Sequence, residues 1–439
     1  MSANREVPGF MGRCDALEFS TDSRNHAQDT PEDIDLVAMA RLCQNYLANN
    51  PLPERGWQCR FSLWGLHFPI LDPWPFNATG KPLPVKLGLV DPITEGDTES
   101  RMDYAYIHMR EMAGSYDAVR RAEDGVRQRV LRHVEDDGLS WIQPWIGGID
   151  VDEQNPERWA SSWTTGKALY AQSELYRLTQ DEGHRTLARK LFEGLRRLAS
   201  WDTGRAYYGG PAWCANKWLP PGEVFPWVVE PIVSYWEATG DEEALEFAVA
   251  FADGMLANLQ PGLGQGAVQP DGSYYSHAHC QLHAISGVAH LGAVTREPRY
   301  IEWARRVYEY VRGKGTDYGW FPEAFTPSPH QRHTEICLVA DMIYMAIWLA
   351  EAGYSSYFDH AERYTRNMLR NALFFATDAY ESLYRQVHAD RPPEAVEEQL
   401  LLVRSLKGGF VACPTPNDLV DADLDHHGTA GDPPLLLDL

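Results

Sequence analysis

Apolar residues recur along this chain with the spacing of α-helices, and the helices that they predict come in pairs. In four segments an apolar stretch ends, a short turn containing Thr, Gly or Asp follows, and an amphipathic stretch begins; these segments start at Arg177, Glu237, Ala293 and Ala350. The equivalent turn positions are Thr179, Thr239, Thr295 and Ala352, with Ala113 in an earlier copy. Because a repeat of about 55 to 65 residues made of two helices is typical of stacked αα-hairpins, the pattern predicts five of them.

The two helices of each predicted hairpin differ in hydrophobic pattern. Residues 161–178 and 334–350 are apolar nearly all round the helix axis, whereas the second helices combine charges with one apolar stripe. This contrast predicts a buried inner ring and an exposed outer ring. A helix over residues 33–49 would supply part of a sixth hairpin, so the expected fold class is all-α, an (α/α)6 barrel. We expect a flexible N-terminal segment (1–32), the barrel domain (33–420) and an irregular tail (421–439).

The connections that precede the inner helices are long and rich in Gly, Pro, Trp and His. They cover residues 138–159, 207–227, 266–283 and 317–333. Since all of them lead into inner helices, they should gather at one mouth of the barrel, and long ordered loops on a rigid scaffold often carry function. Residues 51–100 show no helical period, and no element is predicted there.

Composition narrows the class of ligand. The formal net charge of −23 repels phosphate backbones and anionic lipid surfaces, which argues against nucleic acid and membranes as partners. The chain has 15 Trp and 21 Tyr, and such aromatic rings often line sugar sites because they match the apolar faces of sugar rings. A small carbohydrate or glycoside is therefore the expected partner. The oligomeric state is left open, with a homodimer as one candidate.

The N-terminal sequence and the cysteines indicate the compartment. No basic segment followed by an apolar run begins the chain, and no window approaches 18 uninterrupted apolar residues, so we expect a cytoplasmic protein. The seven cysteines are an odd, scattered set that does not resemble a disulfide framework. Most should be buried thiols, with a minority free for metal binding or catalysis.

Three motifs in the second half of the chain carry a family resemblance. They are PEAF (322–325), TEIC (334–337) and, about 70 residues later, ACPTPN (412–417). In this order they resemble the zinc-dependent, cysteine-nucleophile β-L-arabinofuranosidases of glycoside hydrolase family 127, formerly a domain of unknown function. The resemblance extends weakly over residues 102–418, the catalytic barrel only. It implies a retaining glycoside hydrolase with zinc as its cofactor.

The resemblance also implies site residues. Glu323 would be the acid/base, Glu335 and Cys337 would bind zinc, and Cys413 would be both zinc ligand and nucleophile. The predicted substrate-binding residues are His277, His279, Trp163 and Trp227.

The residue types agree with zinc chemistry. Glu335 and Cys337 are two positions apart and would point about 200° from each other within a helix, so they can face one ion only where the chain enters the helix. A carboxylate together with thiolates suits zinc, and zinc would keep Cys413 ionised at neutral pH. The thiolate would then attack the anomeric carbon while Glu323 protonates the leaving oxygen and later activates water.

Several positions depart from the family pattern. Where the family has adjacent cysteines, this chain has only Cys413; the ungapped match keeps the nucleophile and aligns Asn417, whereas a shift by one places Ala412 at the nucleophile position. The fourth zinc position would be filled by water or by a residue such as His333. Gly166 and Trp227 stand at the family's other sugar-binding histidine positions, so the substrate should not be assumed to be arabinofuranose.

Other interpretations remain open. His277 or His279 could transfer protons in a sugar epimerase or isomerase, the same barrel could hydrolyse unsaturated uronides, and the single thiol is compatible with a non-catalytic sugar-binding protein. At the level of single residues, Cys337 could be a small core residue, Glu323 a helix cap, and the two histidines satisfied polar groups at a helix start.

Overall fold

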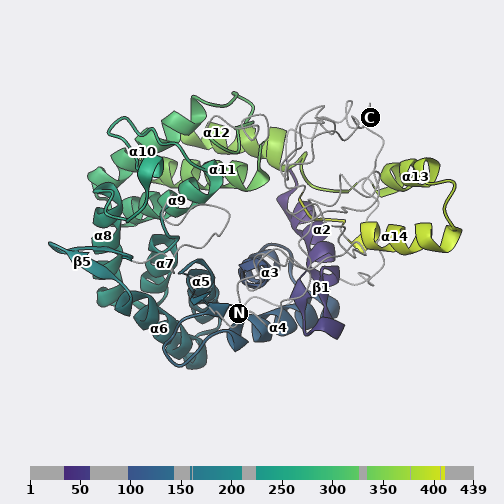
Figure 1. The fold of residues 1–439 in the computed structure, drawn as a ribbon, viewed down its shortest axis with the longest axis horizontal. Coiled ribbons are helices and arrows are strands. Elements are labelled where there is room, and N and C mark those ends of the chain that lie inside the picture. The colour runs from purple at the N-terminus through teal and green to yellow at the C-terminus, as the bar shows by residue number, and fades with distance from the viewer. Residues whose placement is uncertain are drawn as a thin grey trace. The chain divides into compact units, whose positions relative to one another are not determined.

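Antiparallel helix pairs make up most of the described residues of this computed structural model (Figure 1). The described residues are 34–59, 97–142, 159–160, 162–209, 224–325, 334–375, 377–405 and 407–410. The chain divides into two units: residues 1–130, 145–155 and 372–411 form the first, and residues 131–144, 156–371 and 412–439 form the second. The expectation of one barrel domain over residues 33–420 stays a prediction.

The first unit contains five helices and one short hairpin among its described residues. The helices are α2 (Leu36–Asn49), α3 (Asp97–Ala113), α4 (Asp117–Arg132), α13 (Thr377–Val387) and α14 (Pro393–Ser405). β1 (Pro51–Leu52) pairs antiparallel with β2 (Gln58–Cys59) around a 3₁₀ turn, η2 (Pro53–Arg55). α2 packs on α3, and its buried side chains form a small core with Leu373.

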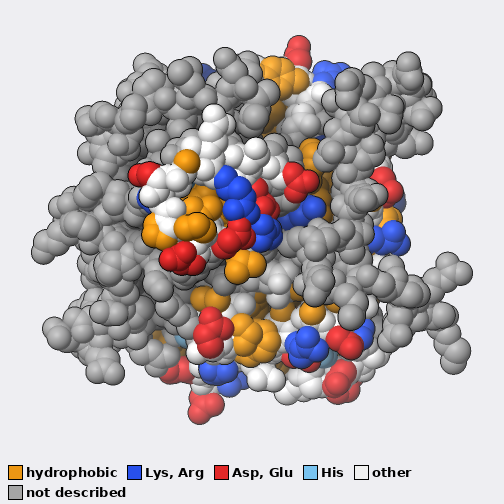
Figure 2. All heavy atoms as spheres, turned by 90° about the vertical axis from the view of Figure 1, so that its right-hand side faces the viewer, with side chains coloured by type: hydrophobic (Ala, Val, Ile, Leu, Met, Phe, Trp, Pro, Cys, Tyr) orange, Lys and Arg blue, Asp and Glu red, His pale blue; other side chains and the backbone are white. Residues whose placement is uncertain are grey.

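Charged pairs hold α13 against α14. The guanidinium of Arg404 on α14 donates from Nε to Glu381 of α13 at 2.7 Å, and Arg385 pairs with Glu397. Figure 2 looks onto the side of Figure 1 that carries these helices and shows acidic and basic side chains next to one another. Such exposed pairs contribute roughly 0 to 1 kcal/mol each, so they order the surface more than they stabilise the fold.

The second unit consists of four helical hairpins in sequence. They are α5 (Ser162–Thr179) with α6 (Glu182–Arg197), α7 (Val229–Thr239) with α8 (Glu242–Leu256), α9 (Ala278–Thr295) with α10 (Pro298–Arg312), and α11 (Ile336–Glu351) with α12 (Tyr357–Tyr364). The minor elements are β3 (Trp141–Ile142), β4 (Trp159–Ala160), β5 (Ser200–Asp202), β6 (Arg205–Tyr207), η5 (Gly264–Gly266) and η7 (Thr365–Leu369). β3 pairs with β4 and β5 with β6, both antiparallel.

The inner and outer helices are those that the hydrophobic pattern predicts. In this unit the inner helices α5, α7, α9 and α11 lie side by side, each packed on the next. The outer helices α6, α8 and α10 lie outside them (Figure 1). Nearly every residue of α9 from Ala278 to Gly292 is buried, whereas α6 buries only a stripe of residues. The inner helices also approach closely: a Cβ on Gly287 of α9 would lie 2.4 Å from the backbone nitrogen of Glu230 on α7.

The repeated turn has a physical basis in its Thr and Asp residues. Thr179 and Thr239 end α5 and α7, and each hydroxyl donates to the carbonyl four residues earlier, at 2.7 Å and 2.6 Å. The same hydroxyls accept from the backbone N–H groups of Asp181 and Asp241. Each Asp then caps the next helix by accepting from the backbone N–H two residues on. A three-residue motif therefore ends one helix and starts the next.

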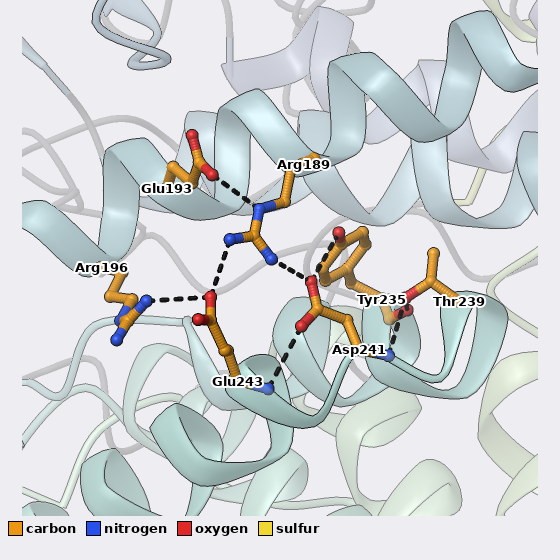
Figure 3. A network of polar contacts seen from close by, with 7 residues as sticks. All are labelled: Arg189, Glu193, Arg196, Tyr235, Thr239, Asp241 and Glu243. Carbon is orange, nitrogen blue, oxygen red and sulfur yellow. Dashed lines mark hydrogen bonds and ion pairs between the residues drawn. The ribbon is translucent and has the colours of Figure 1, made fainter.

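Asp241 has partners beyond the helix cap that it shares with Asp181. It pairs with Arg189 of α6 and accepts from the Tyr235 hydroxyl at 3.0 Å, while Arg189 also reaches Glu193 and Glu243 (Figure 3). Burial, together with this hydrogen bond to Asp241, raises the pKa of Tyr235 to about 12. The network ties α6 to the turn between α7 and α8.

This difference gives a matched pair of stability measurements. Asp181→Ala removes a helix cap and should lower the free energy of unfolding by about 1 kcal/mol. Asp241→Ala removes the same cap and also the Tyr235 and Arg189 interactions, so the loss should be about 1 kcal/mol larger. Urea denaturation followed by circular dichroism compares the two; equal losses would show that the Arg189 network contributes nothing.

A buried histidine joins three inner helices. His290 of α9 is 3% exposed; its Nδ1 lies 3.0 Å from Glu230 of α7 and its Nε2 3.0 Å from Glu237. Its ring stacks on Trp348 of α11 with centroids 3.8 Å apart. Burial lowers the pKa of His290, but the two carboxylates raise it by more, to about 9. The imidazole is therefore charged at neutral pH and bridges the two acidic groups.

The pKa of His290 predicts a pH dependence of stability. Because the pKa is higher in the folded state (about 9) than in the unfolded chain (about 6.5), the charged imidazole stabilises the fold fully below pH 6.5 and this contribution disappears as the pH rises through 9. The stability difference between wild type and His290→Gln should shrink by roughly 3 kcal/mol over this window. Urea titrations at several pH values measure it, and parallel pH curves for the two proteins would contradict the assignment.

Among the described residues, no helix combines the length and the apolar character that crossing a bilayer requires.

Candidate functional site

A loop that pairs with the start of α9 positions the predicted acid/base. Residues 276–278 and 323–325 run antiparallel, with a bridge between His277 and Ala324. The N–H of Ala278 donates to the carbonyl of Glu323 at 2.7 Å, and the N–H of Phe325 donates to the carbonyl of Ser276 at 3.1 Å. Glu323, which is 6% exposed, is thereby held beside His277 by main-chain hydrogen bonds.

Two buried aromatic residues anchor this loop on either side of Glu323. The ring of Phe325 packs edge to face on Tyr274 and Tyr310, with centroids 5.3 Å and 5.4 Å away. Phe321 packs in the same manner on Tyr364 at 5.2 Å. Burial of both rings fixes the backbone of a segment that lacks regular structure, so the carboxylate between them is preorganised.

His277 caps α9 and faces two carboxylates. Its Nδ1 accepts from the backbone N–H of Cys280 at 3.3 Å, as a residue at a helix start can. Its Nε2 lies 3.4 Å from Glu323 and 3.4 Å from Glu335. Because Nδ1 accepts a hydrogen bond, Nε2 carries a proton in the neutral ring, and this nitrogen is the one that lies near both acids.

The two ligands predicted from TEIC lie where α11 begins. Glu335 is the N-cap residue of α11, with an extended backbone, and Cys337 lies in the first turn and is partly exposed. Glu335 and Cys337 are two positions apart, and such residues can face one point only where the chain enters a helix.

One carboxylate on α11 binds two histidines on α9. Asp341, 5% exposed, lies 2.6 Å from Nδ1 of His279 and 2.8 Å from Nδ1 of His283. The ring of His283 stacks on Trp227 with centroids 4.8 Å apart, and Trp163 lies against both histidines. Burial lowers the pKa of His283 although Asp341 raises it, so its ring is neutral at neutral pH.

The structure brings most of the predicted site residues together. His277, Glu323 and Glu335 form one set of contacts, and His279 lies near Glu335 and Cys337. Trp163 and Trp227 are each 3% exposed and pack against His283, whose side chain is 19% exposed. Of these three rings the imidazole is therefore the most accessible. The role of the two tryptophans in substrate binding stays a prediction. Cys413, with the rest of the ACPTPN motif, lies outside the described residues, and so does His333.

His283 and Asp341 were not among the predicted site residues, although the sequence carried signals for both. His279 and His283 are four positions apart and therefore share a helix face. Asp341 is a lone acid inside an apolar helix, and a buried carboxylate requires partners.

The departures at Gly166 and Trp227 are linked by packing. A Cβ on Gly166 of α5 would lie 2.8 Å from the backbone oxygen of Trp227. The backbone of Trp227 therefore occupies the space that any side chain at position 166 would need. The residues at these two positions are therefore coupled by packing.

The donor set fits a zinc ion. Three groups of ligand atoms each lie within 4.8 Å of one another: His279 with Glu335 and Cys337, His277 with Glu323 and Glu335, and His279 with His283 and Asp341. The first group alone offers a thiolate, an imidazole and a carboxylate, which is the combination that zinc accepts. The residues present therefore fit the cofactor that the family resemblance implies.

A separate cavity of about 680 Å³ lies at the other ends of the inner helices. Its lining includes Trp236, Glu237, Arg296, Trp348 and Glu351, at or beyond the last turns of α7, α9 and α11. None of the sequence-predicted site residues borders it.

Comparisons with known proteins show the class of fold. No protein-family model and no curated protein sequence matches the chain. Similar solved structures include a β-arabinofuranosidase of glycoside hydrolase family 127, with a TM-score of 0.53 at 17% identity, covering 77% of this chain and 52% of that one. This chain thus spans about half the length of that enzyme.

Two further structures share the fold. A sugar epimerase from a ruminal bacterium has a TM-score of 0.53 at 12% identity and covers 77% of this chain and 87% of its own. A D-mannose isomerase has a TM-score of 0.51 at 12% identity, with coverages of 77% and 88%. The expected fold class, an (α/α)6 barrel, is therefore confirmed. At these identities the likeness shows the fold alone.

Cysteine reactivity tests the proposed ligand Cys337. Among the four described cysteines, Cys43, Cys59 and Cys280 are buried. Burial raises the pKa of Cys43 to about 12 and that of Cys59 well above its usual value. In metal-free protein, iodoacetamide should therefore modify Cys337 before these three, and added zinc should protect it. Peptide mass mapping measures the order, with urea-denatured protein as the control; labelling of Cys337 that zinc does not slow would count against a metal role.

Proposed function

We propose that this chain is a carbohydrate-active enzyme of the glycosidase type, with Glu323 as its general acid/base. The observation that supports this most is the buried Glu323 carboxylate, which main-chain pairing holds 3.4 Å from the Nε2 atom of His277. An acid/base needs a fixed position and access to a proton, and this arrangement supplies both. The shared barrel fold, found also in a β-arabinofuranosidase, supports a carbohydrate as the substrate class.

The proposed reaction is a retaining double displacement. In the first step the Cys413 thiolate forms a bond to the anomeric carbon, the glycosidic C–O bond breaks, and Glu323 gives its proton to the leaving oxygen. In the second step Glu323 takes a proton from water, the water oxygen bonds to the anomeric carbon, and the thiolate leaves. Glu323 is then protonated again, ready for the next cycle, and its carboxylate lies 3.4 Å from Nε2 of His277. The role of Cys413 rests on the family resemblance, since that residue lies outside the described part of the chain.

Glu335 and Cys337 would hold the zinc ion at the entrance of α11. Bound zinc would supply a positive charge that keeps a nearby thiol ionised at neutral pH. The chain's own contribution is to orient these ligands from a rigid inner helix, with His277 lying 3.4 Å from Glu335. The sugar is proposed to differ from arabinofuranose because Gly166 and Trp227 alter the site.

Substitution of Glu323 separates acid/base catalysis from a structural role. Glu323→Gln should leave zinc content unchanged and slow hydrolysis of glycosides with poor leaving groups by about 10² to 10⁴, with a much smaller effect on activated aryl glycosides, because a good leaving group needs little protonation. Steady-state kinetics on a matched pair of such glycosides gives the measurement. Glu351→Gln, at the exposed far end of α11, is the control and should match wild type on both.

Equal losses on both substrates for Glu323→Gln would argue for a structural role. Mass spectrometry after incubation with a pseudo-substrate that carries a reactive anomeric centre should find the sugar on Cys413. Sugar on a carboxylate, or full activity of Cys413→Ser, would remove the thiolate step and leave a two-carboxylate mechanism.

A second candidate function is sugar epimerisation or isomerisation. It is supported by the pair of imidazoles, His279 and His283, with ring centroids 5.3 Å apart and one shared carboxylate, Asp341, and by the fold shared with an epimerase and an isomerase. Such a reaction exchanges a carbon-bound proton with solvent. Deuterium incorporation into free sugars in D₂O, without need for zinc, would favour this function. Hydrolysis of unsaturated uronides stays a further prediction, and failure of all these assays would favour a non-catalytic sugar-binding protein.

A further inference from the structure

We propose that His279 is a further protein ligand of the zinc ion, beside Glu335 and Cys337, and that Asp341 is the positioning residue that presents it. The inference rests on the zinc site of the proposed function and names the ligand that the sequence left open. It is carried by the proximity of the three donor atoms, all within 4.8 Å of one another, and by the contacts of the surrounding histidines.

The contacts of Asp341 are hydrogen bonds and not a shared metal site. Its oxygens lie 2.6 Å and 2.8 Å from the Nδ1 atoms of His279 and His283. Two ligands on one tetrahedral zinc, each about 2.0 to 2.1 Å from the ion, are separated by roughly 3.3 Å. The observed distances are shorter and match N–H to carboxylate hydrogen bonds. Nδ1 of His279 therefore carries a hydrogen, and Nε2 keeps the lone pair that a metal needs.

His277 cannot take the same role. Its Nδ1 accepts from the N–H of Cys280, so its Nε2 carries a hydrogen in the neutral ring and in the cation alike. That nitrogen lies 3.4 Å from Glu323 and 3.4 Å from Glu335. The two histidines on either side of Ala278 thus have opposite tautomers and opposite functions: His277 donates protons, whereas His279 offers a lone pair.

Helix geometry explains why Asp341 and Cys337 serve one site. They are four positions apart on α11, as His279 and His283 are on α9, so each pair lies on one helix face, and the two helices pack against each other. His279 can therefore contact both Cys337 and Asp341. A carboxylate that fixes the second nitrogen of a ligating histidine is the usual support of a zinc ligand.

Zinc affinity of the full-length, metal-free protein tests the assignment. Zinc is titrated in competition with a chromophoric chelator, and cobalt replaces zinc for absorption spectra. His279→Gln keeps a donor for Asp341 but has no imidazole, and should weaken zinc binding by 10²-fold or more; Asp341→Asn should weaken it 10- to 100-fold. His283→Gln is the matched control, because it makes the same substitution at the other partner of Asp341, and should change affinity less than about threefold.

The cobalt spectra provide a readout that does not depend on activity. The thiolate-to-cobalt absorption should persist in His279→Gln with altered visible bands, and should weaken in Cys337→Ser, because only the latter removes a sulfur ligand. Circular dichroism verifies that each variant is folded, and His279→Ala serves as a second variant if His279→Gln does not fold.

The outcomes separate this inference from the proposed function. Wild-type affinity in His279→Gln, together with loss of zinc in Cys337→Ser, overturns the role of His279 and leaves the zinc site standing. A loss in His283→Gln as large as that in His279→Gln overturns it too, because the ion would then lie among both histidines and Asp341. If the wild-type protein binds no zinc while Glu323→Gln still shows the leaving-group effect, the metal site fails and the acid/base role survives.

Discussion

The buried carboxylate of Asp341 is the constraint on which the candidate site depends. A charged group at 5% exposure inside an apolar helix is costly unless hydrogen bonds replace its hydration. Two imidazole N–H groups of α9 do so, and in return their rings cannot rotate. The orientation of His279 toward Glu335 and Cys337, and the stacking of His283 on Trp227, both follow from this pair of bonds.

A second buried carboxylate links neighbouring inner helices in the same way. Glu230 of α7 binds His290 of α9 and the hydroxyl of Tyr344 of α11, so another buried carboxylate joins neighbouring helices. The difference lies in protonation: His290 has carboxylates at both nitrogens and is charged, whereas His283 has one and is neutral. Apolar side chains alone allow neighbouring helices to pack in several registers. Buried polar pairs of this kind favour the one register in which both partners meet, at some cost in stability.

The candidate site takes its side chains from both helices and a loop, and packing fixes both. The inner helices supply Cys337, Asp341 and the histidines from rigid backbone, while the acid/base comes from the loop before α11. That loop is fixed by pairing with residues 276–278 and by the burial of Phe321 and Phe325. Glu323 is thus as well positioned as a residue on a helix, although no helix period marks it in the sequence.

Much of the fold could be predicted from the sequence because its causes are local. The ends of α5, α7 and α9 coincide with Thr179, Thr239 and Thr295, since each Thr hydroxyl bonds the carbonyl four residues earlier. After α5 and α7 an Asp cap then starts the next helix within a few residues. The contrast between α9 and α6 was likewise visible as hydrophobic periodicity. The entry of Glu335 into α11 followed from a two-residue spacing and one rule of helix geometry.

The tertiary structure alone decided what the histidines do. His277 and His279 are two positions apart and look equivalent in the sequence, yet one meets the backbone N–H of Cys280 and the other meets Asp341, 62 residues away. The burial of Trp227 and the loss of side-chain space at Gly166 likewise depend on which backbone passes nearby. Tautomer, exposure and partner are set by contacts between distant segments, and hydrophobic periodicity reports only which face of a helix is buried, not what lies against it.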